Sequence, residues 1–339
     1  MKKLIALLLA LVMVLSLAAC GTNDTPDTPD NTDPIKLNIA YMPNWGALWA
    51  VATADAKGYF AEEGIEINLV QFDNGPNEIA AMEEGSIDIA YIGPGAHKLC
   101  STGKAEVMLL QHLGDGDCII GLKGLNKLED LKGKTVGYAA GTSSETILKV
   151  ALESVGLTMD DITAMNMNAS NLTMAAISGE VDAVAAWAPS SLTILAQAEG
   201  AVDICSNVDF PSLVSPGSWV VNPKWADANA DIIVKFARAM YKAMDYAAAA
   251  TTDDAIAEEV AGYIAKIIAK DASAVLEERY TGSWMTSAQL KEMLESGAVE
   301  KVYADQQATF IAGGALEAEG NLAPADFVLI QLMKDAFGN

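Results

Sequence analysis

The stretch that decides the fold is 72–98, FDNGPNEIAAMEEGSIDIAYIGPGAHK. Gly75-Pro76 predicts the start of a short helix, because proline at the first helical position gives up an amide donor that has no partner there. Residues 86–92 alternate as a strand, and Gly93-Pro94-Gly95 then turns that strand directly into another helix. Free backbone N–H groups at such a turn point beyond the strand end, where open α/β sheets bind ligands.

Two motifs in this stretch, GPNEIAAMEEGSIDIA (75–90) and IGPGA (92–96), resemble those of a known family. It comprises the solute-binding proteins of ABC importers for nitrate, alkanesulfonates, taurine and the pyrimidine precursor of thiamine. The resemblance implies an α/β chain with the two-lobe periplasmic-binding-protein fold (type II), a ligand in the cleft between the lobes and a helical C-terminal region. It also implies a permease and an ATPase as partners.

The composition agrees with a globular protein of two lobes. The chain has 339 residues, of which 51% are hydrophobic and 19% are charged. That length exceeds one ordinary hydrophobic core. The net charge of −24 argues against a nucleic-acid partner and against electrostatic docking on anionic lipid.

The N-terminus has the pattern of a bacterial lipoprotein. Residues 1–19 carry two lysines and then an apolar run too short for a confident membrane span, which predicts a signal peptide. Cys20 follows Leu-Ala-Ala, so we expect it to be lipidated, although an ordinary secretory signal with an incidental cysteine is the alternative. Residues 20–34 predict a disordered tether on an extracytoplasmic, membrane-anchored protein at the cell surface or in the periplasm.

Alternating strands and helices predict a parallel sheet in each lobe. We expect 35–114 together with 222–339 to form lobe 1 and 115–221 to form lobe 2. Hinges are expected at Gly114–Asp117 and at the returning strand Ser218–Val221. From Ala228 onward the pattern is helical, with a closing helix from Pro324 to Phe337.

Three loops and one strand end are expected to converge on the cleft. The helix N-termini at Gly93 and Thr142 would face each other from opposite lobes and offer N–H donors to a ligand. The predicted ligand-binding residues are Asn44, Trp45, Trp49, Tyr91, Gly93, Pro94, Gly95, Thr142, Ser143, Ser144 and Trp187.

Several of these residues have a purely structural alternative. Trp45 and Trp49 could belong to the core, and Tyr91 could be a packing residue. Glu145 could cap its own helix through a Thr-x-x-Glu capping box. His97 is expected behind the site or on the surface.

The cysteines leave two possibilities open. Cys118 and Cys205 lie on two predicted strands and could form a disulfide. Alternatively Cys100, Cys118 and Cys205 are three buried thiols, as free cysteines commonly are.

The ligand class is the least determined property. The aromatic candidates and the acidic chain favour a neutral or cationic nitrogenous solute such as a pyrimidine. The family also includes binders of sulfonate, taurine and nitrate, so an anion held by helix N-termini is the alternative. Ala188 stands after Trp187 where the family often has aspartate, which argues further against sulfonate or nitrate.

Other functional classes fit less well. The chain has two histidines, no metal-ligand spacing and no Gly-x-Ser-x-Gly motif, so we expect no enzyme activity, no metal site and no cofactor. A tethered sensor that binds a protein partner is a further alternative. We expect a monomer.

Overall fold

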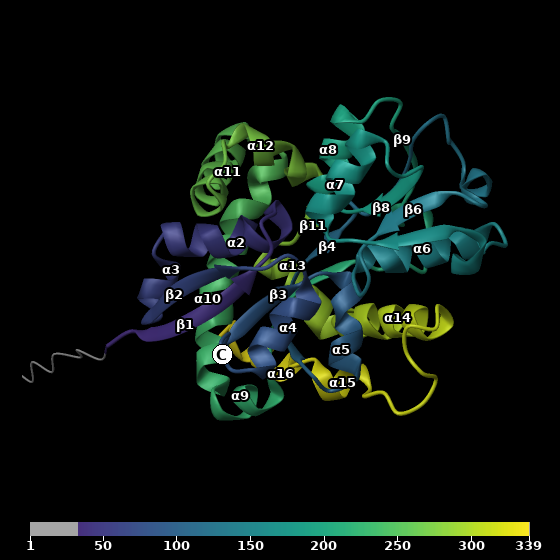
Figure 1. The fold of residues 1–339 in the computed structure, drawn as a ribbon. Coiled ribbons are helices and arrows are strands. Elements are labelled where there is room, and N and C mark those ends of the chain that lie inside the picture. Colours follow the sequence, from purple (N-terminus) through teal and green to yellow (C-terminus); the bar gives the residue numbers. More distant parts are fainter. Residues whose placement is uncertain (1–32, 339) are drawn as a thin grey trace, which may run out of the picture. The chain divides into compact units, whose positions relative to one another are not determined.

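The computed structural model describes residues 33–338. The predicted signal peptide, the lipidation site Cys20 and nearly all of the predicted tether lie outside the described residues. The described part forms two α/β lobes, each built on its own sheet (Figure 1). None of its helices is both long enough and apolar enough to cross a membrane.

Lobe 1 contains a six-stranded sheet in the order β11-β4-β10-β3-β1-β2. Its strands are β1 (Ile35–Tyr41), β2 (Ile65–Gln71), β3 (Ile89–Ile92), β4 (Glu106–Gly114), β10 (Pro216–Val221) and β11 (Gly282–Trp284). β1 pairs in parallel with β2 and β3, whereas β10 is antiparallel to β3 and β4. The loops that follow β1 and β3 therefore leave the sheet at the same edge, which faces the second lobe.

Helices from both ends of the described chain cover this sheet. The early ones are α2 (Trp45–Ala56), α3 (Tyr59–Glu62), α4 (Gly75–Glu83) and α5 (Lys98–Ser101). The late ones are α9 (Pro223–Ala228), α10 (Ala230–Ala247), α11 (Asp254–Ile268), α12 (Ser273–Leu276), α13 (Ser287–Ser296), α14 (Ala298–Ala312), α15 (Pro324–Phe327) and α16 (Ile330–Asp335). Phe236, Met240 and Met244 form a buried stripe on α10, as their spacing predicts.

Lobe 2 contains a five-stranded sheet in the order β7-β6-β8-β5-β9. Its elements are β5 (Cys118–Gly121), β6 (Thr135–Tyr138), α6 (Ser143–Ser154), β7 (Thr163–Asn166), α7 (Ala169–Ser178), β8 (Ala183–Ala186), α8 (Ser190–Gln197) and β9 (Val202–Ser206). Helix α6 packs into a hydrophobic cluster on one face, and α7 and α8 pack into a separate cluster on the other. The lobe thus has two modest cores, whereas lobe 1 has one large core.

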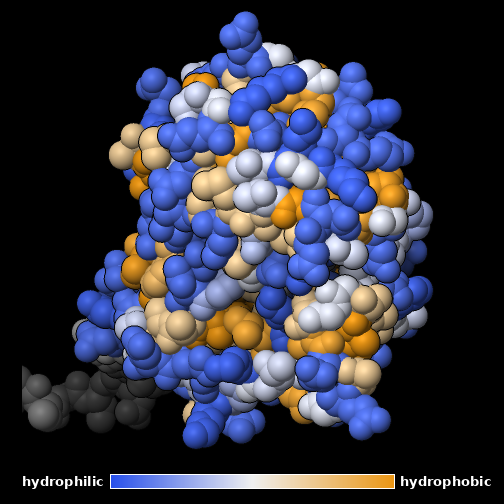
Figure 2. Space-filling model, turned by 45° about the vertical axis from the view of Figure 1, so that its right-hand side comes forward, coloured by the Kyte–Doolittle hydropathy of each residue, from blue (hydrophilic) through white to orange (hydrophobic). Residues whose placement is uncertain are grey.

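Short 3-10 helices complete the described chain: η1 (Pro94–His97), η2 (Leu128–Leu131), η3 (Met159–Asp161), η4 (Asn207–Asp209), η5 (Ala248–Thr251) and η6 (Glu277–Tyr280). The face of the molecule shown in Figure 2 is mostly hydrophilic, with hydrophobic side chains in scattered patches. This agrees with the acidic composition.

The chain crosses between the lobes twice, and the second crossing differs from the predicted one. Strand β10 pairs with β3 and β4 and so belongs to lobe 1, whereas the sequence predicts that lobe 2 extends to Val221. The crossings are therefore 115–117 and 207–215. Asn207 joins them, because its backbone N–H donates to the Asp117 carbonyl (2.9 Å) and its Nδ2 donates to the Gly114 carbonyl (3.0 Å).

Two local predictions were wrong. The helix expected after Gly93 is a 3-10 turn followed by the four-residue α5. The closing helix is broken into α15 and α16 by Val328, which forms a parallel bridge with Val107. The C-terminal region is helical as predicted, with one added strand, β11, which joins the edge of the lobe 1 sheet beside β4.

The cysteine alternatives are resolved by the register of lobe 2. Cys100, Cys118 and Cys205 are free and buried. Cys205 lies opposite Ile119, the neighbour of Cys118, so the two cysteines point to opposite faces of the sheet. They belong to different hydrophobic clusters and cannot approach each other.

Candidate functional site

A cavity lies between the two lobes, with about 690 Å³ of non-protein space that includes open solvent. Both lobes and both crossings contribute to its wall. The predicted residues on this wall are Asn44, Tyr91, Gly93, Pro94, Gly95, Thr142, Ser143 and Trp187. A concave space lined by aromatic side chains and a few polar groups is typical of a small-molecule site.

Trp45, Trp49 and Ser144 do not line the cavity, so the structure does not place them where a ligand contact was predicted. Asn44 caps α2 by accepting a hydrogen bond from the Ala47 N–H (2.8 Å). The helix therefore starts at Trp45, and the four-residue spacing directs both tryptophans to its core side, where neither is exposed. There they pack against Trp284, with ring centroids 6.4 and 5.5 Å apart.

An aromatic wall on lobe 1 combines Tyr91, His112 and Trp284. The Tyr91 and His112 rings are nearly parallel with centroids 6.1 Å apart, and the His112 and Trp284 centroids are 4.7 Å apart. The Tyr91 hydroxyl lies 3.4 Å from His112 Nε2. Gly217 makes room for the imidazole, because a Cβ there would lie 2.1 Å from His112 Cε1.

His112 is neutral at physiological pH. Burial lowers its pKa to about 3, since no described acid pairs with the ring. Its Nδ1 is buried and has no hydrogen-bond partner among the described residues. The wall is therefore aromatic and uncharged, with one imidazole nitrogen still able to form a hydrogen bond.

The turn after β3 brings lobe 1 against lobe 2. A Cβ on Gly95 would lie 2.0 Å from the Thr142 carbonyl carbon, so only glycine permits this approach. The Pro94 carbonyl accepts hydrogen bonds from Gln306 Nε2 (2.9 Å) and from His97 Nδ1 (3.2 Å). His97 itself is buried behind the cavity, where Nε2 lies 2.9 Å from the Ser218 hydroxyl.

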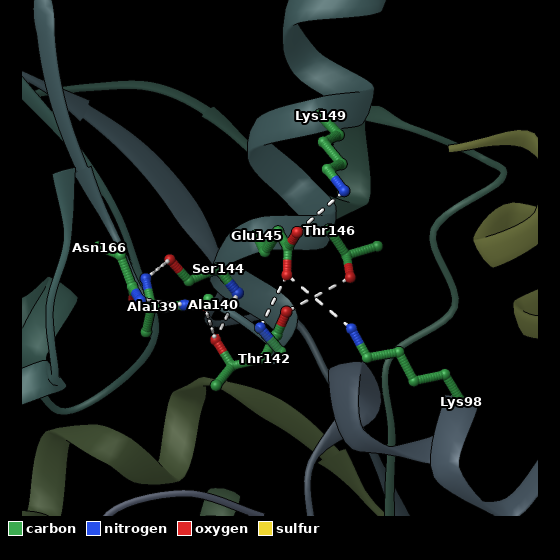
Figure 3. A network of polar contacts seen from close by, with 10 residues as sticks. Lys98, Ala139, Ala140, Thr142, Ser144, Glu145, Thr146, Lys149 and Asn166 are labelled. Carbon is green, nitrogen blue, oxygen red and sulfur yellow. Dashed lines mark hydrogen bonds and ion pairs between the residues drawn. The ribbon is translucent and has the colours of Figure 1, made fainter. Parts of the chain in front are cut away.

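The turn before α6 is the lobe 2 counterpart (Figure 3). The Thr142 hydroxyl accepts from the Ser144 N–H (3.3 Å), and Glu145 accepts from the Gly141 N–H (2.7 Å). The Ser144 hydroxyl accepts from the Ala139 N–H and donates to the Ala185 carbonyl, which buries it away from the cavity. Glu145 therefore has a structural role, although its partner is Gly141 and not the cap residue that a capping box requires.

Asp117 is a buried acid on the cavity wall that sequence reasoning did not select. Its Oδ1 accepts a hydrogen bond of 2.5 Å from the Ser143 hydroxyl. Burial raises the pKa of this carboxyl to about 6, although the Ser143 and Ser215 hydroxyls lower it in part. An acidic residue at the predicted hinge, Gly114 to Asp117, is the only local feature of the sequence that could have marked Asp117 as a cavity residue.

Glu278 is a second buried acid on the wall, and it comes from η6 in lobe 1. Its Oε2 accepts from the Trp45 backbone N–H (2.8 Å) at the start of α2. Burial raises the pKa of Glu278 to about 7. Trp284 and Thr281 reach the cavity from the same region, which sequence reasoning treated as helical and remote.

The cavity wall has no Lys or Arg among the described residues. Arg238 pairs with Glu63 and Arg279 pairs with Asp254, and neither arginine lines the cavity. Trp187 faces the cavity from the end of β8, opposite the aromatic wall of lobe 1. No group of three or more His, Cys, Asp or Glu in residues 33–338 is arranged to hold a metal ion.

The sequence of this chain matches the NMT1/THI5-like family over residues 47–252. The chain belongs to this family. A Brucella abortus relative named "Putative binding protein" is 28% identical over 88% of this chain and 91% of its own length. The taurine-binding periplasmic protein of Escherichia coli is 22% identical over 55% of this chain and 59% of its own.

The fold comparison agrees with the family. The periplasmic nitrate-binding protein NrtA of Synechocystis PCC 6803 superposes with a TM-score of 0.71 at 12% sequence identity, covering 90% of this chain and 88% of that one. The predicted family and the two-lobe periplasmic-binding-protein fold are both confirmed. The site residues themselves remain predictions as ligand contacts.

Proposed function

We propose that this family member is the extracytoplasmic solute-binding component of an ABC importer. It would capture one small organic solute in the inter-lobe cavity and deliver it to a membrane permease with its ATPase. The observation that supports this most is the cavity itself, because two lobes joined by two crossings enclose polar and aromatic groups around one small-molecule space. Taurine and nitrate binders share its fold or family.

Lobe closure is the proposed mechanism. Hinge motion at 115–117 and 207–215 would separate the lobes, and a ligand that touches both walls would favour the closed state. Thr309 on α14 supports such a closed state, because its hydroxyl donates to the Ser212 carbonyl (2.7 Å) on the second crossing. We further propose that Cys20 is lipidated and tethers a monomer outside the cytoplasmic membrane.

Within this function we propose a neutral or cationic nitrogenous solute, such as a pyrimidine. The wall provides two carboxyl groups, hydroxyls and three aromatic rings but no described Lys or Arg. Sulfonates and nitrate are the alternative, which the names of several relatives favour. They would depend on backbone N–H groups near Gly93 and Thr142.

A thermal-shift screen of the full-length chain in mild detergent tests this proposal. The library contains pyrimidines, purines, amines, amino acids, alkanesulfonates, taurine and nitrate. A ligand at 100 times its dissociation constant stabilises a protein by about 2.7 kcal/mol, which is a shift of several degrees at this size. No hit in any class would contradict solute capture.

We also propose binding without conversion. Each hit is incubated with the protein for hours, released by denaturation and identified by mass spectrometry. We expect the compound to be recovered unchanged, with a saturable stoichiometry near one by calorimetry. A new product formed at a rate proportional to protein concentration would contradict this part.

A further inference from the structure

Asp117 occupies a position where the ligand and the hinge meet. It lies in the first crossing, and its carboxyl group is only 6% exposed while lining the cavity. Ser143 on lobe 2 donates to Oδ1, and the backbone carbonyl of Asp117 accepts from Asn207 in the second crossing. A carboxylate has about four acceptor positions, so acceptor capacity remains on the cavity side.

No positive charge compensates this acid. The titratable groups around it are Asp115 in the same crossing, Cys118 in β5 and Tyr91 in β3, and none of them is cationic. Asp117 takes part in none of the ion pairs of the described residues. The Ser143 and Ser215 hydroxyls are its partners, but a buried carboxylate without a cation nearby is still costly, which favours binding of a proton or of a ligand that brings a cation or N–H donors.

Glu278 repeats the arrangement on lobe 1. It is 2% exposed, and its carboxyl group accepts one hydrogen bond, from the Trp45 N–H, and forms no ion pair among the described residues, although Lys270 lowers its pKa in part. The neutral His112 adds a buried, unpartnered Nδ1 on the same wall. Two acids without an ion pair and one unpartnered imidazole nitrogen, from separate elements, thus line one cavity together with aromatic side chains.

We infer that Asp117 and Glu278 are the specificity-determining residues of this cavity, and that they select a solute carrying N–H donors or a positively charged nitrogen and exclude anions. Hydrogen bonds from charged or N–H groups to carboxylates are among the stronger ones in proteins. Aromatic faces such as Trp187 and Trp284 attract the same class of ligand. The inference rests on the proposed function and deepens it by naming the ligand class and the selecting groups.

Calorimetry on the full-length chain in mild detergent tests the selection. The probes are 4-amino-5-hydroxymethyl-2-methylpyrimidine and 4-aminopyridine for the nitrogenous class, and taurine and methanesulfonate for the anions. We expect a nitrogenous probe to bind and Asp117→Asn or Glu278→Gln to weaken it at least tenfold. The matched control is Asp115→Asn, which removes an exposed acid of the same crossing and should change affinity less than twofold.

The possible outcomes distinguish the inferred ligand selectivity from the proposed function of solute capture. Binding of an anionic probe with no nitrogenous binding overturns the inference and leaves solute capture standing. Nitrogenous binding that survives both substitutions also overturns it. Absence of binding by every probe, together with no hit in the wider screen, overturns the proposed function itself.

A second measurement needs no ligand. A buried acid whose role is to bind a ligand lowers the stability of the ligand-free protein, whereas an acid with a structural role raises it. We therefore expect Asp117→Asn to raise the melting temperature of the ligand-free chain at pH 7.5 by a few degrees, and to lose this gain as the pH falls towards 4. A lower melting temperature for Asp117→Asn at pH 7.5 would assign the carboxylate a structural role and overturn the inference.

Discussion

Two turns that look alike in the sequence behave differently in the structure. Both Gly93–His97 in lobe 1 and Thr142–Glu145 in lobe 2 carry the chain from a strand towards a helix at the cavity edge. The first leads into a 3-10 turn and a four-residue helix, and the second caps the twelve-residue α6. The first turn is defined by contacts to other elements, whereas the second satisfies its polar groups largely within itself.

This difference changes what each turn can offer a ligand. A short 3-10 turn has little helix dipole, so an anion gains less at Gly93 than the sequence suggested. In the second turn Thr142, Ser144 and Glu145 occupy three of the backbone donors around the helix start. The contribution of lobe 1 is thus a close backbone contact and aromatic surface, and lobe 2 contributes the Ser143 hydroxyl and Trp187.

The largest effect should come from a substitution that prevents the close contact between the two turns. Gly95→Ala places a Cβ 2.0 Å from the Thr142 carbonyl carbon, and neither backbone can move aside without opening the lobes. Overpacking costs about 1–3 kcal/mol, which corresponds to an affinity loss of about 5- to 150-fold. Calorimetry with the best solute measures this loss, and small-angle scattering should show a larger radius of gyration.

Gly93→Ala is the matched control for this prediction. Its Cβ would approach only Met42 Cε, at 3.9 Å, so the radius of gyration should stay unchanged, and the radius is the readout of this control because Gly93 itself lines the cavity. Equal behaviour of the two variants would show that the lobes do not depend on the Gly95 contact.

The next effect tests whether the lobe 2 turn stabilises itself. Ser144→Ala removes a buried hydroxyl that donates to the Ala185 carbonyl (2.7 Å) and accepts from the Ala139 N–H (3.0 Å). Two buried backbone groups lose their partner, so the free energy of unfolding should fall by about 2–3 kcal/mol. Urea denaturation measures this value.

Ser143→Ala serves as the comparison, because its hydroxyl reaches only Asp117 on the cavity wall. It should cost less than about 1 kcal/mol of stability. If Ser143→Ala proved as destabilising as Ser144→Ala, the cavity-side hydroxyl would be part of the fold of the turn.

A third helix start at the cavity, that of α2, gives a pH-dependent effect. Glu278 accepts from the Trp45 N–H, and burial raises its pKa from 4.5 to about 7. The folded state therefore holds a proton that the unfolded state releases, and the associated stability is lost as pH rises from about 4.5 to 7. Glu278→Gln has no such loss and should be more stable than the native chain by about 2–3 kcal/mol at pH 8.

Melting curves of both proteins between pH 4 and pH 8 measure this difference. The two melting temperatures should converge as the pH falls below about 4.5, where the acid becomes protonated in both states. A constant difference across this range would mean that ionisation of Glu278 is not what separates the two proteins.

The smallest effect concerns the ion pairs behind the lobe 2 turn. Glu145 lies 2.8 Å from Lys149 within α6 and 3.8 Å from Lys98 in lobe 1 (Figure 3). Burial alone would raise its pKa, but the two lysines and the Gly141 amide together lower it. Glu145→Gln keeps the acceptor for Gly141, so it should cost under about 1 kcal/mol, and less in 0.5 M salt.

Thermal denaturation at two salt concentrations measures this loss. Lys149→Gln is the control for the pair within α6. A loss above 2 kcal/mol that is insensitive to salt would show that this carboxylate does more than balance two partly exposed lysines.

Local sequence patterns predicted most of the elements. The alternation of strands and helices expected in both lobes is present. These elements follow from residue periodicity, glycine and proline positions and caps, which act over a few residues. The turns at Gly93 and Thr142 reached the cavity for the same reason.

The missed elements and residues depend on distant partners. β11 is three residues long and forms only because β4 offers an open edge. Glu278 lies 233 residues from Trp45, to which it is hydrogen-bonded, and neither Glu278 nor Trp284 is marked by a local pattern as part of the cavity. Trp45 and Trp49 carry a binding-loop signal in the sequence, but the start of α2 directs them into the core.

The sequence by itself determined the family, the two-lobe α/β class and the strand-end turns, because periodicity and short motifs encode local structure. Only the tertiary structure decided which side chains share the cavity. It placed β10 in lobe 1 and directed Cys118 and Cys205 to opposite faces of the lobe 2 sheet. It also brought Asp117 and Glu278 to a cavity with aromatic side chains and no described Lys or Arg. Burial and charge at a site depend on contacts between segments far apart in the chain, and these contacts exist only once the lobes have packed.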